Sequence, residues 1–397
     1  MTLPVPVTLP PSPEPFVLLD DARPVAGACA RLYRDPVSEI TARRPEEVVS
    51  ALEAIRAAAA QGLHAAGYLR YEAGHALEPA LAPLATGAGG EEAPLLWFGL
   101  FPSCETIPAD AVPDLLPPPL CSRHGPAIPA ISEADHAAAM ARVLALIRAG
   151  DIYQANLTLA ASVALPGDPL ASYAAIRPRA AMGHGALVRH DGRHILCFSP
   201  ESFFAIRDGG IEAVPMKGTA PRHHDPATDA EAAAMLRTDP KQRAENLMIV
   251  DLIRNDLARV CAAGSVRVPD LFAVESYPTV HQMVSRVTGR LRADRDAVDA
   301  LKALFPCGSI TGAPKIRAMQ VIADVESHRR GVYTGSIGSI SPDGDARFNV
   351  AIRTISVEKD VPFGVMGIGS GIVADSLPDA EWDECLAKAR FLEGIED

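Results

Sequence analysis

The sequence has 397 residues, of which 48% are hydrophobic, and a formal net charge of -12. A chain of this size can bury a large core, and its acidic balance argues against a nucleic-acid-binding surface, which would have to be basic. Its seven cysteines include no Cys-x-x-Cys pair, which argues against a zinc site of that type and fits reduced thiols.

No uncharged apolar run reaches the roughly 18 residues of a membrane span. The N-terminus also lacks the basic and apolar regions of a secretory signal. We therefore expect a cytoplasmic protein with neither membrane nor nucleic-acid partners. Composition divides the chain into a Pro-rich arm over residues 1–15, a first portion over 16–130 and a motif-rich portion over 131–397.

The predicted elements point to an α+β fold. A helix is predicted around Met140 to Ile147, where apolar residues recur at helical spacing before Gly150, and a strand follows over residues 152–161. Because strands outnumber a simple βαβ alternation, we expect large, mostly antiparallel sheets. Further strands are predicted over residues 194–206, 211–215, 335–340, 348–357 and 365–373, and helices over 240–260, 297–304, 313–326 and 378–392.

Two of these helices carry carboxylates with a charged neighbour four residues away. Glu245 follows Lys241, and Glu384 precedes Lys388. Such spacing is typical of surface ion pairs worth a few tenths of a kcal/mol. The alternative is that one carboxylate from each helix holds magnesium, which keeps several waters and needs few protein ligands. Spacing alone leaves both interpretations open.

Two Gly-rich segments and one arginine could approach an anion. The segments are residues 217–219 and 367–371, and neither has the spacing of a Walker or Rossmann motif. Arg353 lies in an apolar run predicted as a strand. If it is buried there, we expect a bidentate carboxylate partner; if the strand lies at an edge, the side chain faces water.

Taken together, these segments resemble the chorismate-utilising enzyme family in both content and order. The resemblance covers about residues 130–393, and residues 16–100 resemble the N-terminal portion of the family more loosely. Its ordered blocks are residues 150–157, 199–201, 215–219, 239–241, 245–252, 254–256, 308–315, 333–338, 351–354 and 369–375, with Glu384 and Lys388.

The resemblance implies two facing α/β halves whose sheets form a sandwich, with the active site in the cleft between them. It implies that Glu245 and Glu384 match the magnesium ligands of the family, and that the metal neutralises a substrate carboxylate. Gln282 departs from the pattern, because many relatives have a ring-contacting His there. The substrate-binding positions implied are Gln154, Gly218, Thr219, Ser309, Tyr333, Arg353, Gly369, Ser370, Gly371 and Lys388.

Three residues suggest the reaction. Members that add water resemble one another in having Lys where Gln154 stands, and a glutamine cannot act as a general base. Members that form 4-amino-4-deoxychorismate typically have Lys where Lys217 stands. The resemblance implies that Lys217 attacks the ring as a nucleophile while Glu201 protonates the leaving hydroxyl. Lys217 could instead only pair with a substrate carboxylate.

The expected role is therefore to supply 4-amino-4-deoxychorismate for p-aminobenzoate and folate synthesis. No Gly-x-Cys-x-Gly segment is present, so we expect a separate glutamine amidotransferase subunit to supply ammonia. The alternatives are anthranilate formation and a non-catalytic chorismate-binding role.

Overall fold

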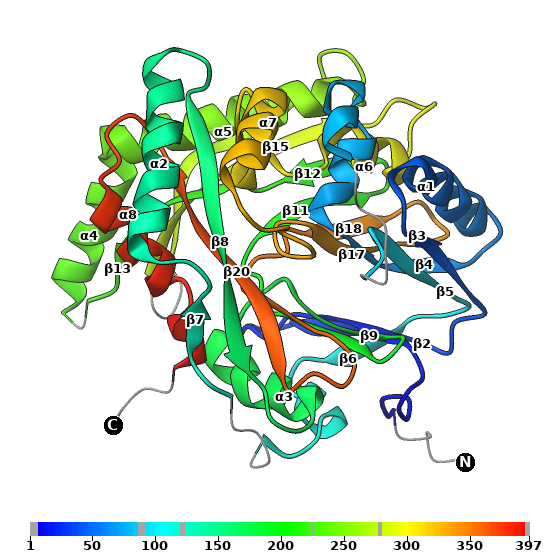
Figure 1. Cartoon of the computed structure of the whole chain (residues 1–397). Helices are drawn as coiled ribbons and strands as arrows, with labels where there is room; N and C mark the ends of the chain where they lie inside the picture. The colour runs from blue at the N-terminus through cyan, green and yellow to red at the C-terminus, as the bar shows by residue number, and fades with distance from the viewer. Residues whose placement is uncertain (1–6, 86–92, 120–123, 224, 277–279, 394–397) are drawn as a thin grey trace.

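Two large antiparallel sheets face each other at the centre of the molecule, and helices cover their outer sides (Figure 1). The structure is a computed structural model and describes residues 7–85, 93–119, 124–223, 225–276 and 280–393. This architecture confirms the predicted α+β class. Within the described residues, no helix is both long and apolar enough to cross a membrane.

Within the described residues, sheet A has ten strands. In spatial order they are β16 (Gly312–Ala313), β8 (Gln154–Ala164), β20 (Phe363–Ile372), β19 (Thr354–Val357), β10 (Arg193–Cys197), β9 (Gly185–His190), β1 (Phe16–Asp20), β2 (Cys29–Arg34) and β6 (Glu105–Pro108), with β7 (Ala127–Pro129) paired to β8.

Sheet B also has ten strands in the part of the chain that the structure describes. Their order is β13 (Met216–Pro221), β15 (Val280–Arg290), β12 (Gly210–Ala213), β11 (Ser202–Arg207), β18 (Ala346–Asn349), β17 (Ser336–Ile340), β4 (His64–Leu69), β5 (Leu96–Phe101) and β3 (Ser38–Ala42), with β14 (Arg267–Ser276) paired to β15. Each sheet thus contains strands from both sides of residue 130.

Several helices begin at recognisable caps. Ser132 and Asp135 form a capping box at the start of α2, and Asp239 caps α5 just before Pro240. The α-helices are α1 (Pro45–Ala60), α2 (Glu133–Arg148), α3 (Pro169–Ala180), α4 (Pro226–Thr238), α5 (Pro240–Ala258), α6 (Ala297–Leu304), α7 (Lys315–Val325) and α8 (Pro378–Ala387). The 3-10 helices are η1 (Tyr71–Ala76), η2 (Pro79–Ala85), η3 (Val112–Leu115), η5 (Gly308–Ile310) and η6 (Arg390–Leu392).

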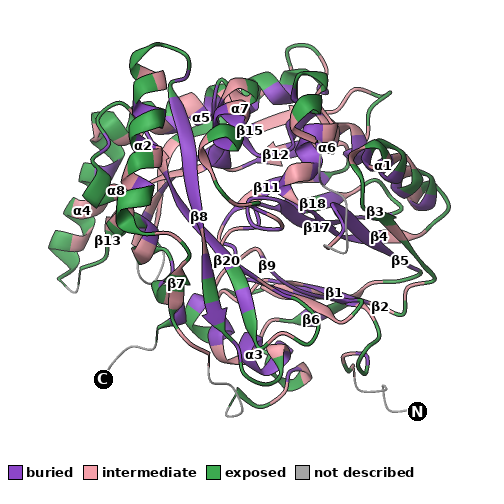
Figure 2. Ribbon diagram, viewed as in Figure 1, coloured by how far each residue is buried: buried purple, intermediate pink, exposed green. Residues whose placement is uncertain are grey.

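Burial follows this layering, with buried strands inside and exposed helix faces outside (Figure 2). One apolar cluster lies between the two sheets and includes Tyr68 and Trp97 from sheet B and Val188 from sheet A. Tyr68 Oη and His190 Nε2 also meet across this interface at 3.0 Å. The other two clusters join sheet B to α1, α5, α6 and α7, and sheet A to α3 and α8.

Two predicted strands are wrong in one respect, because each is really two strands in different sheets. The run over residues 194–206 divides into β10 in sheet A and β11 in sheet B. The run over residues 348–357 divides into β18 in sheet B and β19 in sheet A. The predicted helix over 313–326 also begins later, at Lys315, because the preceding residues pair with β8.

Candidate active site

The two strands that change sheets do so side by side. Residues 198–201 connect β10 to β11, and residues 350–353 connect β18 to β19. We call these two connections the seam. Phe198 N donates to Arg353 O and Val350 N donates to Glu201 O, each at 3.0 Å. Backbone hydrogen bonds therefore fix Glu201 and Arg353 where the sheets diverge.

Tyr333 is attached to the same seam. Thr334 N donates to Ala351 O at 2.8 Å, and Ala351 N donates to Gly335 O at 3.0 Å. The Tyr333 ring packs against Gly367 of β20, where an added Cβ would lie 1.9 Å from the ring Cδ1. Gly367 is thus required for the phenol to reach this place. Burial also raises the pKa of Tyr333, so it stays neutral.

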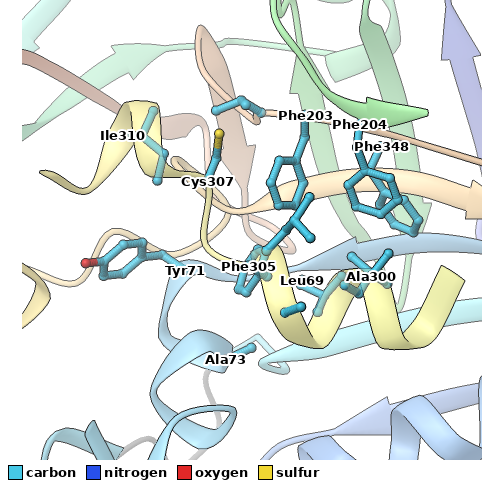
Figure 3. Close-up of a cluster of buried hydrophobic side chains, with 14 of the residues drawn as sticks. Leu69, Tyr71, Ala73, Phe203, Phe204, Ala300, Phe305, Cys307, Ile310 and Phe348 are labelled. Atoms are coloured by element: carbon cyan, nitrogen blue, oxygen red, sulfur yellow. The ribbon is translucent and has the colours of Figure 1, made fainter. Parts of the chain in front are cut away.

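Glu201 is buried at the end of the seam. Ser309 of η5 donates its hydroxyl to Glu201 Oε1 at 2.7 Å. Burial raises the pKa of Glu201, although the Ser309 hydrogen bond and the charges of Lys217 and Lys388 oppose that shift. A carboxyl with a raised pKa can hold a proton to donate. Cys307, which contacts the Ser309 hydroxyl at 3.2 Å, belongs to the apolar cluster in Figure 3.

Lys217 interacts electrostatically with four charged groups, which are Glu201 of the seam, Glu245 of α5, and Glu384 and Lys388 of α8 and its C-terminal cap. Burial lowers its pKa, and the like charge of Lys388 lowers it further. Glu201, Glu245 and Glu384 act in the opposite direction. The structure thus brings together the predicted nucleophile, the predicted acid and both predicted metal ligands.

Strands β8 and β20 form the wall beside Lys217. A Cβ placed on Gly371 would lie 3.6 Å from Lys217 Nζ and 2.6 Å from Gln154 Nε2. Gln154 is buried, and its amide oxygen has no hydrogen-bonding partner among the described residues. A buried polar atom of this kind is costly unless something satisfies it. Ser370 is also buried, with its hydroxyl beside the Cys385 thiol of α8.

Lys388 is held against the same wall. Its ammonium donates to Gly369 O at 2.7 Å and pairs with Glu384 at 2.7 Å. The side chain of Glu384 is 52% exposed, so the surface ion pair that its spacing suggested is present. The hydrogen bond from Lys388 to Gly369 joins the end of α8 to β20.

Glu245 faces the same space from α5. Its side chain makes no hydrogen bond or ion pair with another described residue. Burial raises the pKa of Glu245, and the positive charges of Lys217 and Lys241 oppose that shift. The negative charge of Glu384 raises the pKa further, so the two carboxylates interact electrostatically. Lys241 and Asp375 pair at 3.0 Å and tie α5 to the segment before α8. Within the described residues, no group of three His, Cys, Asp or Glu is placed to hold a metal.

Arg353 differs from both interpretations of the sequence. It lies in the seam rather than in a strand, with a left-handed φ of 50°. Its guanidinium donates to Met182 Sδ at 3.4 Å and has no carboxylate partner within the described chain. The bidentate protein partner expected for a buried Arg353 is therefore absent there. Because burial lowers the pKa of Arg353, an anion at this place would be favourable.

Thr219 and Gly218 lie beside Lys217 on β13, and Thr219 Oγ1 donates to Gln282 Oε1 at 3.1 Å. Sequence reasoning assigned no role to Asn246, whose amide lies 3.4 Å from Lys217 O. The sequence does indicate that Asn246 is buried, because this polar residue lies on the same helix face as the apolar Ile249 and Val250.

Two cavities in the described part of the chain lie elsewhere. One of about 170 Å³ is lined by Tyr71, His75 and Arg330, and one of about 260 Å³ by Leu252, Phe305 and Lys315. Neither is lined by Glu201 or Lys217. The candidate site therefore rests on converging side chains and not on either of these two cavities.

Comparison with known proteins identifies relatives of the chain. A family model described as chorismate binding enzyme matches residues 14–394. The chain is 44% identical to aminodeoxychorismate synthase component 1 of Klebsiella aerogenes over 256 residues, which are 64% of this chain and 56% of that protein. It is 43% identical to anthranilate synthase component 1 of Methanothermobacter thermautotrophicus over 246 residues, 61% of this chain and 52% of that one. The matched part thus spans about half of each relative.

A solved structure matches over nearly the whole length. Anthranilate synthase component I from Streptococcus pneumoniae superposes with a TM-score of 0.76 at 25% identity, covering 99% of this chain and 95% of that one. The two-sheet architecture is therefore shared with that protein.

Proposed function

The chain belongs to the chorismate binding enzyme family, and from this membership we propose that it replaces the C4 hydroxyl of chorismate with an amino group. The product would be 4-amino-4-deoxychorismate. The observation that carries this proposal is the placement of Lys217 beside Gly371 of β20, where it interacts electrostatically with Glu201, Glu245, Glu384 and Lys388. Curated relatives named aminodeoxychorismate synthase support it.

The proposed reaction has two displacement steps. In the first, neutral Lys217 forms a bond from Nζ to C2 of the ring, both ring double bonds shift by one position, and the C4–O bond breaks. Glu201 gives its proton to the departing hydroxyl, which leaves as water. In the second, ammonia bonds to C4, both double bonds shift back, the bond from C2 to Nζ breaks, and Lys217 leaves as the neutral amine. Covalent catalysis of this kind divides one difficult step into two easier ones.

Chorismate is a dianion, and the chain offers a separate group of contacts for each carboxylate. Arg353 and Tyr333 at the seam would bind one, since the guanidinium has no carboxylate partner in the described chain. Lys388, with backbone amides near Gly369 and Gly371, would bind the other. Gln154, Gly218, Thr219, Ser309 and Ser370 complete the proposed contacts.

We propose that Glu245 and Glu384 hold Mg²⁺. They come from two helices, and the charge of Glu384 acts on Glu245. Within the described residues, no third acidic side chain completes a group that could hold a metal. This arrangement fits an ion that keeps waters and substrate oxygens as its other ligands. When bound, the ion would supply positive charge to a substrate carboxylate. The ammonia would come from a separate glutamine amidotransferase, a partner consistent with relatives named component 1.

Product identity tests the proposal. The purified chain is incubated with chorismate, Mg²⁺ and an ammonium salt, and the product is measured by mass. We expect an amine that retains the enolpyruvyl group. Anthranilate with released pyruvate would establish the second candidate function, which the anthranilate synthase relatives support. Chorismate binding without turnover, with both ammonium and an added glutaminase, would indicate a non-catalytic role.

A further inference from the structure

We propose that Asn246 and Gln282 are positioning residues whose amides hold a β-bulge at Lys217 and Gly218 and so aim the lysine at the reacting ring. The inference rests on the role proposed above for Lys217. In the ladder between β13 and β15, Met216 lies opposite Val284 and Thr219 lies opposite Gln282. Lys217 and Gly218 together therefore oppose one residue, Met283.

A bulge of this kind bends a strand and redirects a side chain. Gly218 makes it possible, because its φ is +102° and a Cβ there would lie 3.1 Å from Gln242 Oε1 and 3.2 Å from Met283 Cβ. The bulged strand carries Lys217 Nζ across to β20, within 3.6 Å of a Cβ position on Gly371. The aim of the lysine thus depends on the bulge.

The register shift interrupts the regular ladder at Lys217 and Gly218, whose backbone carbonyl groups need donors. Lys217 O accepts from Asn246 Nδ2 at 3.4 Å. Gly218 O accepts from Gln282 Nε2 at 2.9 Å. One amide comes from α5 and the other from β15, so the bulge is held from two sides.

Both amides are fixed in the orientation that this contact requires. Ser285 Oγ donates to Asn246 Oδ1 at 2.6 Å, and Thr219 Oγ1 donates to Gln282 Oε1 at 3.1 Å. Because hydroxyl donors occupy the amide oxygens, the NH₂ groups face the carbonyls. Asn246 also follows Glu245 directly on α5, so the same helix turn carries a proposed metal ligand and holds the lysine backbone.

Gln282→Met is the decisive variant, because it keeps the side-chain length, removes both hydrogen bonds and changes a residue that is only half-buried. We expect kcat to fall about 10- to 100-fold, the size of effect that misplacing a reacting group produces. KM for chorismate should stay within about two-fold. The Lys217–substrate adduct, followed by intact mass with ammonia withheld, should form more slowly by the same factor as kcat.

Asn246→Ala should act in the same direction, and Ser285→Ala more weakly, because the Asn246 amide keeps its NH₂ group. Ser265→Ala is the matched control, since Ser265 bonds Ala262 O at 2.7 Å near the opposite end of β15. It should lower the melting temperature without slowing the adduct.

The outcomes separate the two proposals. If the wild-type chain forms the adduct and Gln282→Met forms it equally fast, the positioning role is overturned and the role of Lys217 stands. If the wild-type chain turns over without any lysine adduct, the role of Lys217 fails, and the positioning role fails with it.

Discussion

Two regions contribute acidic groups to the candidate site, and they are built differently. The seam holds Glu201 through buried backbone hydrogen bonds, including Val350 N to Glu201 O at 3.0 Å. The helix pair α5 and α8 holds Glu245 and Glu384 through exposed ion pairs, including Lys241 with Asp375 at 3.0 Å. A proton donor needs one fixed position and a raised pKa, whereas carboxylates that bind an ion with its waters can tolerate adjustment.

Replacing Lys217 tests whether both regions act on one reaction centre. This replacement should have the largest effect on kcat. Lys217→Arg should lower kcat at least about 1000-fold, because a guanidinium keeps its proton and cannot attack. Lys217→Ala should leave only weak direct amination, since Glu201 can still protonate the hydroxyl. Steady-state rates with ammonium measure both, and intact mass should show an adduct in the wild type alone. A fully active Arg variant would mean that Lys217 only pairs with a carboxylate.

The helix pair should respond to magnesium. Glu245→Gln and Glu384→Gln each remove a negative ligand while keeping the side-chain shape, so each should abolish turnover at low Mg²⁺ with the fold intact. Residues that merely support a metal ligand cost about 10- to 100-fold, and these losses should exceed that. Circular dichroism checks the fold and a Mg²⁺ titration of the rate checks the affinity. Wild-type activity at low Mg²⁺ in either variant would show that its carboxylate is not a ligand.

The sequence predicted the parts of this site that lie within single elements. The helix carrying Glu245 and the strand carrying Gln154 follow from periodicity and caps, and the family resemblance supplied the candidate roles. The seam could not be predicted, because residues 194–206 and 348–357 each look like one continuous strand. The change of sheet depends on hydrogen bonds between distant segments, such as Phe198 with Arg353. The bulge at Lys217 likewise depends on pairing with β15.

A pH measurement sharpens the account of the seam. Ser309 donates to the charged form of Glu201, which lowers the pKa that burial raises. In Ser309→Ala that stabilisation is lost, so the pKa of Glu201 should rise and the protonated acid should persist to higher pH. Lys217 must be neutral while Glu201 is protonated, so kcat/KM should be bell-shaped. The limb of the pH profile that is governed by the pKa of Glu201 should move to higher pH in Ser309→Ala. An unchanged profile would show that Ser309 does not influence the pKa of Glu201.

The smallest expected effects compare the stability of the two regions directly. Ser199 donates to Val350 O at 2.6 Å and accepts from Glu201 N at 3.1 Å, and it is fully buried. Ser199→Ala leaves both groups without this partner, so the free energy of unfolding should fall by about 1–3 kcal/mol. Asp375→Asn breaks a pair whose side chains are 51% and 67% exposed, so it should change that free energy by less than about 1 kcal/mol. Urea unfolding of both variants measures the difference. If Asp375→Asn were as costly as Ser199→Ala, the helix pair would be as firmly held as the seam, and the adjustable role given to its carboxylates would be wrong.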